Sequence, residues 1–160
     1  MNEKGQVSVY DFVFGFLVFM LLFATLKFVW FQNFDSGLEQ QKLDQMEFEA
    51  NRAIDSMLRF PGTPSNWNSS NVQFIGLAQA GKYNVLDEGK VSLFSGLPYP
   101  QSLQLLQVDF NFLFEIDSKN NNFDLNIGNS GIPSNVRVVS VQRMVSYKGG
   151  EAIVRLKVFE

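Results

Sequence analysis

The chain has 160 residues, of which 46% are hydrophobic and 18% are charged, so its length allows one domain and a membrane segment. The net charge is −3 and the Lys and Arg residues form no basic stripe, which argues against binding to DNA or RNA. Cys and His are absent, which excludes disulfides, thiolate nucleophiles, zinc sites with nitrogen or sulfur ligands, and imidazole bases. We therefore expect a protein that is not an enzyme and uses no cofactor.

An apolar segment near the start has the length of a membrane-spanning helix. Residues 12–31 contain a single charged residue, Lys27, and about 20 apolar residues cross a bilayer core of roughly 30 Å. Lys27 and Trp30 lie near its end, where an amine and an indole reach the headgroup region. Ala24-Thr25-Leu26 lacks the small-residue pattern of a secretory cleavage site. The segment therefore predicts a single-pass membrane helix that ordinary signal cleavage would not remove.

One acidic residue, Asp11, directly precedes this segment. A carboxylate at the edge of an apolar helix is costly unless it stays at the membrane interface or meets a cation. The residues alone leave both readings open. The charge balance near the start does not orient the helix either, because Lys4 and the α-amine are offset by Glu3 and Asp11.

A second helical pattern is expected after a local break at Asp35-Ser36-Gly37, from Leu38 to about Phe60. Its apolar residues recur every three or four positions and so form one stripe, with charged and amide side chains opposite. Pro61-Gly62 ends the pattern. The stripe, which we expect to face a core, consists of Leu43, Met46, Ala50, Ala53, Ile54, Met57 and Leu58.

The next region has the composition of turns and short elements. Residues 61–71 are rich in Pro, Gly, Ser and Asn and include Trp67, which we expect to pack as a lid. Asn68-Ser69-Ser70 is an N-glycosylation sequon, which matters only outside the cell. We expect a short strand at 72–77 and a short helix at about 86–94.

Alternating apolar residues predict a half-buried strand from Val108 to Asp117, with Leu113 as the one exception, and a hairpin partner containing Phe123, Leu125 and Ile127. The polar turn between them, 118–122, lacks the ligand spacing of a calcium loop. We therefore predict no metal site. The acids considered as paired carboxylates or calcium ligands are Asp109, Glu115, Asp117 and Asp124. Of these, Asp109 and Glu115 lie on the polar strand face, and we expect them to be solvated.

The last hairpin is predicted from Gly149-Gly150, because both glycines accept the positive φ of a two-residue turn. This turn sets the register and makes one face nearly all apolar. The expected pair beside the turn is Lys148 with Glu151. The expected pairs on the apolar face are Tyr147 with Ala152, Val145 with Val154, Arg143 with Leu156, and Val141 with Val158. Those on the other face are Met144 with Arg155 and Gln142 with Lys157.

These elements predict an α+β fold in which a long N-terminal helix, first transmembrane and then amphipathic, packs against a C-terminal antiparallel sheet. The expected segments are a start of five residues (1–5), the transmembrane helix (6–34), the amphipathic helix (35–60) and a β-rich head (61–160).

The start of the chain, Lys4-Gly5-Gln6-Val7-Ser8 followed by the apolar segment, resembles the class III signal of archaeal type IV pilin-like proteins. In that family a prepilin peptidase cuts after the glycine and leaves the apolar helix attached. The resemblance places the cut between Gly5 and Gln6 and makes 1–5 a leader peptide. Other segments that resemble archaeal proteins with such a leader are 61–67 (PGTPSNW), 74–77 (FIGL), 85–87 (VLD) and 154–160 (VRLKVFE).

The resemblance implies a membrane protein with its head outside the cell and other pilin-like subunits as partners. Family members typically carry a glutamate at the fifth mature position, where it meets the N-terminal amine of a neighbouring subunit, but this chain has Tyr10 there and Asp11 one place later. That shift turns the acid by about 100° around a helix. Asp11 is the expected substitute contact in the filament core, and an accessory or minor subunit fits better than a major pilin.

Two functions therefore remain open. The first is a structural or accessory subunit of a pilus-like surface filament, processed after Gly5. The second is a single-pass membrane-anchored surface protein that never polymerises and whose head binds a partner. The two differ in cleavage at Gly5 and in whether the apolar helix meets protein or lipid.

Overall fold

The computed structural model describes residues 3–118 and 123–160, with the backbone alone for 3–8, 32–38 and 123. The chain divides into two compact units, Met1–Lys42 (the N-terminal unit) and Leu43–Glu160 (the C-terminal unit). The described elements are α1 (Glu3–Arg59), α2 (Glu88–Ser95), α3 (Tyr99–Leu106), β1 (Asn111–Ser118), β2 (Phe123–Gly128), β3 (Val138–Tyr147) and β4 (Gly150–Phe159).

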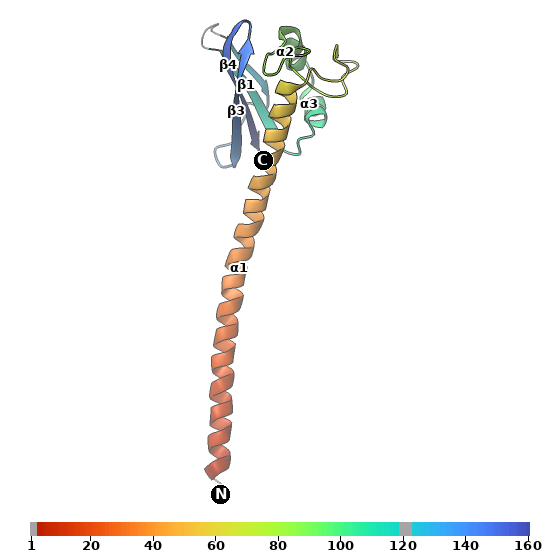
Figure 1. Ribbon diagram of the computed structural model, residues 1–160. Helices are drawn as coiled ribbons and strands as arrows, with labels where there is room; N and C mark the ends of the chain where they lie inside the picture. Colours follow the sequence, from red (N-terminus) through yellow and green to blue (C-terminus); the bar gives the residue numbers. More distant parts are fainter. Residues whose placement is uncertain (1–2, 119–122) are drawn as a thin grey trace. The chain divides into compact units, whose positions relative to one another are not determined.

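The strands form one antiparallel sheet in the order β2-β1-β4-β3, so β1 and β4 are central and β2 and β3 are edges. In Figure 1 the sheet, α2 and α3 lie around the C-terminal part of α1. The inward side chains of the sheet and the apolar stripe of α1 share one buried core, which also includes Val91 and Phe94 of α2. The predicted α+β fold, with a long helix packed against an antiparallel sheet, is confirmed.

Helix α1 is continuous in the region where we expected a break. Its backbone is helical across Asp35, Ser36 and Gly37, so that prediction is wrong. A glycine inside a helix costs about 1 kcal/mol relative to alanine, which is too little to end a helix that is formed on both sides. The end at Arg59, just before Pro61, agrees with the prediction. The predicted stripe is also confirmed, since Leu43 is half-buried and its other members are buried.

The segment after α1 closes the C-terminal end of that helix. The strand expected at 72–77 is absent, and only isolated bridges, Thr63 with Phe74 and Ala78 with Leu86, occur there. The last carbonyl groups of a helix have no partners within it, and backbone N–H groups of residues 77–84 supply them here. These bonds run from Leu77 to Met57 (2.8 Å), from Ala78 to Phe60 (3.2 Å) and from Asn84 to Leu58 (3.1 Å). Leu77, the last residue of the expected strand, therefore caps α1 instead of pairing in a sheet.

Trp67 occupies the predicted position in this cap. Its side chain is buried in the core, and its indole Nε1–H donates to the carbonyl oxygen of Gly76 at 3.0 Å. A buried indole needs such a partner, because its N–H would otherwise lose its hydrogen bond to water. The Trp67 side chain is thus held in place by packing and by one hydrogen bond.

The two short helices differ in how well the sequence predicted them. Helix α2 is confirmed, and the Asp87 carboxylate caps it by accepting the Lys90 backbone N–H at 3.1 Å. Helix α3 was not predicted, and it carries Pro100 in its first turn. A proline in the first turn of a helix loses no hydrogen bond, since N–H groups there have no helical acceptor.

The first hairpin follows the prediction closely. Strand β1 begins at Asn111, three residues later than expected, and pairs with β2 from Ser118 opposite Phe123 to Leu113 opposite Gly128. The turn 119–122 lies outside the described residues. Leu113, the exception to the alternation, is buried although its neighbours on that face are partly exposed.

The register predicted for the last hairpin is wrong by two residues. The turn consists of Lys148 (φ 52°) and Gly149 (φ 74°), so Tyr147 faces Gly150 and Val145 faces Ala152. A shift of two residues keeps every side chain on its predicted face, so the apolar pattern does not distinguish the two registers. The other register required Gly150 in the turn, whereas here Lys148 adopts the left-handed backbone.

Candidate functional site

The apolar segment of the N-terminal unit is one candidate functional region. Residues Val9–Phe31 form a helix that is long and apolar enough to cross a membrane, judged by length and composition. Every residue from 9 to 31 is exposed. Large apolar side chains without cover need a partner or a lipid environment, because contact with water is unfavourable for them.

The predicted processing and contact residues all lie on α1. Gly5 and Gln6 have helical backbone, and the structure describes only the backbone of these two residues. Asp11 is exposed, as is Lys27, whose Nζ lies 5.8 Å from the centre of the Phe23 ring. Sixteen residues separate Asp11 from Lys27, so the two charges of one helix do not meet.

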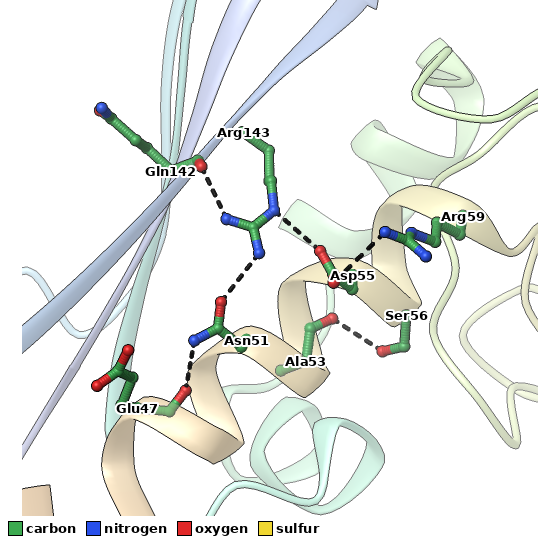
Figure 2. A network of polar contacts seen from close by, with 8 residues as sticks. All are labelled: Glu47, Asn51, Ala53, Asp55, Ser56, Arg59, Gln142 and Arg143. Atoms are coloured by element: carbon green, nitrogen blue, oxygen red, sulfur yellow. Dashed lines mark hydrogen bonds and ion pairs between the residues drawn. The ribbon is translucent and has the colours of Figure 1, made fainter. Parts of the chain in front are cut away.

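A polar network ties the C-terminal part of α1 to the edge strand β3. Figure 2 shows the Arg143 guanidinium reaching from the sheet to two side chains of the helix. Its Nε donates to Asp55 Oδ1 at 2.9 Å, and its Nη2 donates to Asn51 Oδ1 at 2.9 Å. Asp55 also lies 3.7 Å from Arg59 Nη2. In the sequence, this contact was indicated only by Arg143 itself, a charged residue on an otherwise apolar face of the predicted strand.

A buried ammonium group contacts the segment that follows α1. Lys90 Nζ donates to the carbonyl oxygens of Pro61 at 2.7 Å and Ala78 at 3.1 Å. Burial lowers the pKa of Lys90, and the nearby Asp87 carboxylate opposes that shift. A positive charge is favourable just beyond the C-terminus of a helix, where carbonyl dipoles point outward. Lys90 therefore stabilises the cap of α1, and no pattern of residues indicated its burial.

A buried carboxylate holds the segment before β1. The two oxygens of Glu49 accept the Gln45 amide at 2.9 Å and the Asp109 backbone N–H at 3.0 Å. Asp109 thus contributes its backbone here, which the sequence did not indicate.

Two acids of the first hairpin, Glu115 and Asp117, pair with basic side chains of the neighbouring strand β4. Glu115 pairs with Lys157 at 2.8 Å, and Asp117 lies 3.5 Å from Arg155, so these acids are ion-paired across β1 and β4 and not simply solvated. Asp124 is exposed. Among the residues that the structure describes, no group of three or more acidic side chains is placed to hold a metal.

The sequon residue Asn68 is exposed in a turn of the C-terminal unit. Its Oδ1 accepts the backbone N–H groups of Ser70 at 2.9 Å and Asn71 at 3.2 Å. The amide oxygen is thus held by the backbone of Ser70 and Asn71, while the residue remains exposed.

A pocket of about 350 Å³ lies between α2, β2 and the β3–β4 turn. Tyr147 is buried beside this pocket. Its burial is the larger cause of a raised phenol pKa, and the nearby Glu88 carboxylate is the smaller one. A phenol that holds its proton more tightly is a poor base and nucleophile. The lining consists of Glu88, Val91, Ser92, Ser95, Leu125, Tyr147 and Lys148.

No protein-family model matches the chain, and no curated protein and no solved structure shows significant similarity to it. The functional conclusion therefore depends on the residues and their placement.

Proposed function

We propose that the chain is a structural or accessory subunit of an archaeal type IV pilus-like surface filament, without enzymatic activity. The observation that carries the proposal is the division of one helix, α1, between two environments. Its segment Val9–Phe31 is apolar and exposed on all sides, whereas its stripe from Met46 to Leu58 is buried against a sheet. Such a helix suits a subunit stored in a membrane and later packed among other apolar helices.

In this proposal a prepilin peptidase removes residues 1–5 and leaves Gln6 as the new N-terminus. The apolar segments then form the filament core, with Asp11 as a contact between subunits. The heads (61–160) face solvent outside the cell, where Asn68 is accessible for glycosylation. The sequence resemblance at Lys4-Gly5-Gln6 supports the cleavage step, and the exposure of Asp11 and Asn68 is compatible with both roles.

The second candidate is a single-pass membrane-anchored surface protein that does not polymerise. The position of Asp11 favours it, because the acid stands one residue beyond the place that pilin-like proteins typically use, about 100° around the helix. In this case the segment Val9–Phe31 stays in lipid, and the head binds a partner.

Intact mass and N-terminal sequencing of the protein from its native membrane and surface fractions test the proposal. A mature chain that begins at Gln6 and is found in sheared filaments supports the pilus-like subunit. An uncut chain that begins at Met1 or Asn2 and stays in the membrane fraction refutes it and favours the anchored protein.

A further inference from the structure

The apolar segment contains two charges of opposite sign. Asp11 and Lys27 are the only charged residues from Val9 to Phe31 in the sequence, and both side chains are exposed on α1. An isolated charge surrounded by apolar helices is strongly unfavourable unless an opposite charge reaches it. Packing of this segment against other helices therefore requires a partner for each of them.

Neither charge finds that partner within its own helix. Side chains meet along a helix at spacings of three and four residues. The residues at these spacings carry no charge, and they are Val7, Ser8, Phe14 and Gly15 for Asp11 and Phe23, Ala24, Trp30 and Phe31 for Lys27. A second copy of this helix carries the opposite charge that each of them lacks at these spacings.

Helical geometry fixes how a second copy would supply it. Sixteen residues at 1.5 Å per residue separate Asp11 from Lys27 by about 24 Å along the axis. Sixteen steps of 100° place the two side chains about 160° apart, on nearly opposite faces of the helix. One neighbour therefore cannot contact both charges of the same helix.

We propose that Asp11 of one copy pairs with Lys27 of a parallel neighbouring copy that is shifted by about 24 Å along the helix axis. This inference rests on the proposed function, because it names the contact through which the filament core assembles. Each helix uses Asp11 toward one neighbour and Lys27 toward another on its opposite side. A contact between two different patches does not close into a twofold dimer and propagates into an open assembly.

Charge reversal tests the pairing. Asp11→Lys and Lys27→Asp, each alone, place like charges at the contact, and we expect the amount of sheared filaments to fall at least about tenfold. The double variant restores an opposite pair, so its filament yield returns toward that of the unchanged chain. A double variant that is as defective as the single variants overturns the proposal.

Cysteine cross-linking tests the geometry independently, because the chain contains no cysteine of its own. A chain carrying Asp11→Cys and Lys27→Cys, oxidised in the native filament and membrane fractions, is expected to give a ladder of dimers, trimers and longer products. The matched control carries Phe12→Cys and Phe28→Cys, which keeps the sixteen-residue spacing but turns both sites by about 100° away from the contact. Products that stop at dimers, or equal ladders from both variants, refute the proposed contact.

N-terminal sequencing and electron microscopy of the unchanged chain separate the two levels of the argument. Filaments whose subunits begin at Gln6, but which give no Asp11–Lys27 ladder, leave the proposed function standing and overturn the pairing. An unchanged chain that stays uncut and forms no filaments overturns both.

Discussion

Replacing Gly76 with alanine should destabilise the C-terminal unit severely, because this glycine packs directly on the backbone that ends α1. An added Cβ would meet the Gly62 nitrogen, the Phe60 oxygen and the Pro61 carbonyl carbon, the last at 2.7 Å, whereas real Cβ contacts stay above 3.0 Å. None of these backbone atoms moves without displacing the helix cap. The variant therefore forces a shift of the cap as well as a local clash.

The magnitude follows from two contributions. Overpacking of a dense site costs typically about 1–3 kcal/mol. Displacing Gly76 also weakens the hydrogen bond of 3.0 Å that its oxygen accepts from the Trp67 indole, and such a bond contributes about 1 kcal/mol. The buried indole N–H is then left without its partner, which costs a further ~1 kcal/mol or more. We expect Gly76→Ala to lower the free energy of unfolding by about 3–5 kcal/mol, a large share of the roughly 5–15 kcal/mol of a typical domain.

Urea unfolding of the fragment Leu43–Glu160 measures this change. The fragment contains the whole core cluster, and Trp67 is its only tryptophan, so its fluorescence reports on the cap itself. Gly131→Ala is the matched control, because its Cβ meets only the Asn129 side chain at 3.4 Å, and it should change stability by less than about 0.5 kcal/mol. A loss below about 1 kcal/mol for Gly76→Ala would refute the packing argument.

Three further predictions concern the core, the titration of a buried phenol and the link between sheet and helix. Phe114→Ala removes a fully buried ring that meets Phe94 edge to face, so urea unfolding should show a loss of about 3–5 kcal/mol, and a loss near zero would contradict its burial. Burial, and secondly a nearby carboxylate, raise the pKa of Tyr147 above 10. As the pH rises above 10, the unfolded form therefore loses this proton while the folded form keeps it, and the free energy of unfolding should fall. Tyr147→Phe should reduce that slope in thermal unfolding measured from pH 9 to 11, and an unchanged slope would count against the shift. A double-mutant cycle of Asp55→Ala and Arg143→Ala should give a coupling of about 0.5–1 kcal/mol, since both side chains are about one third exposed, and additive losses would show that the contact contributes nothing.

Periodic patterns predicted the elements whose burial is one-sided. The stripe from Leu43 to Leu58 and the alternation from Val108 to Asp117 repeat at the periods of a helix and a strand, and both proved to face the core. The α+β fold followed from these two patterns.

The errors arose where several backbone arrangements satisfy the same pattern. The two registers of the last hairpin bury the same residues, so only the backbone at Lys148 distinguishes them. The apolar residues of 72–77 fit a strand, but the N–H of Leu77 bonds to the open end of α1, and those of Gln73 and Phe74 bond to Thr63. No local pattern displays these partners.

The candidate functional residues were predictable to different degrees. Asp11 and Asn68 are visible as a charge beside an apolar segment and as a sequon, whereas the ion pairs of Glu115 and Asp117 depend on the distant partners Lys157 and Arg155. Such contacts are set by the pairing of β1 with β4, about 40 residues apart in sequence, and therefore appear only after the fold is known.

The inward-facing Arg143 also has a consequence for solubility. Strand β3 is an edge of the sheet, and an open edge is a template on which strands of other molecules can add. A charge on the inward face of an edge strand opposes such addition, because an added strand would cover a guanidinium that is 36% exposed here. At the other end of β3, Ser146 already bonds to Asn84 and Leu86, which covers that part of the edge. Neighbouring copies of the chain thus keep their sheets separate even when they lie close together.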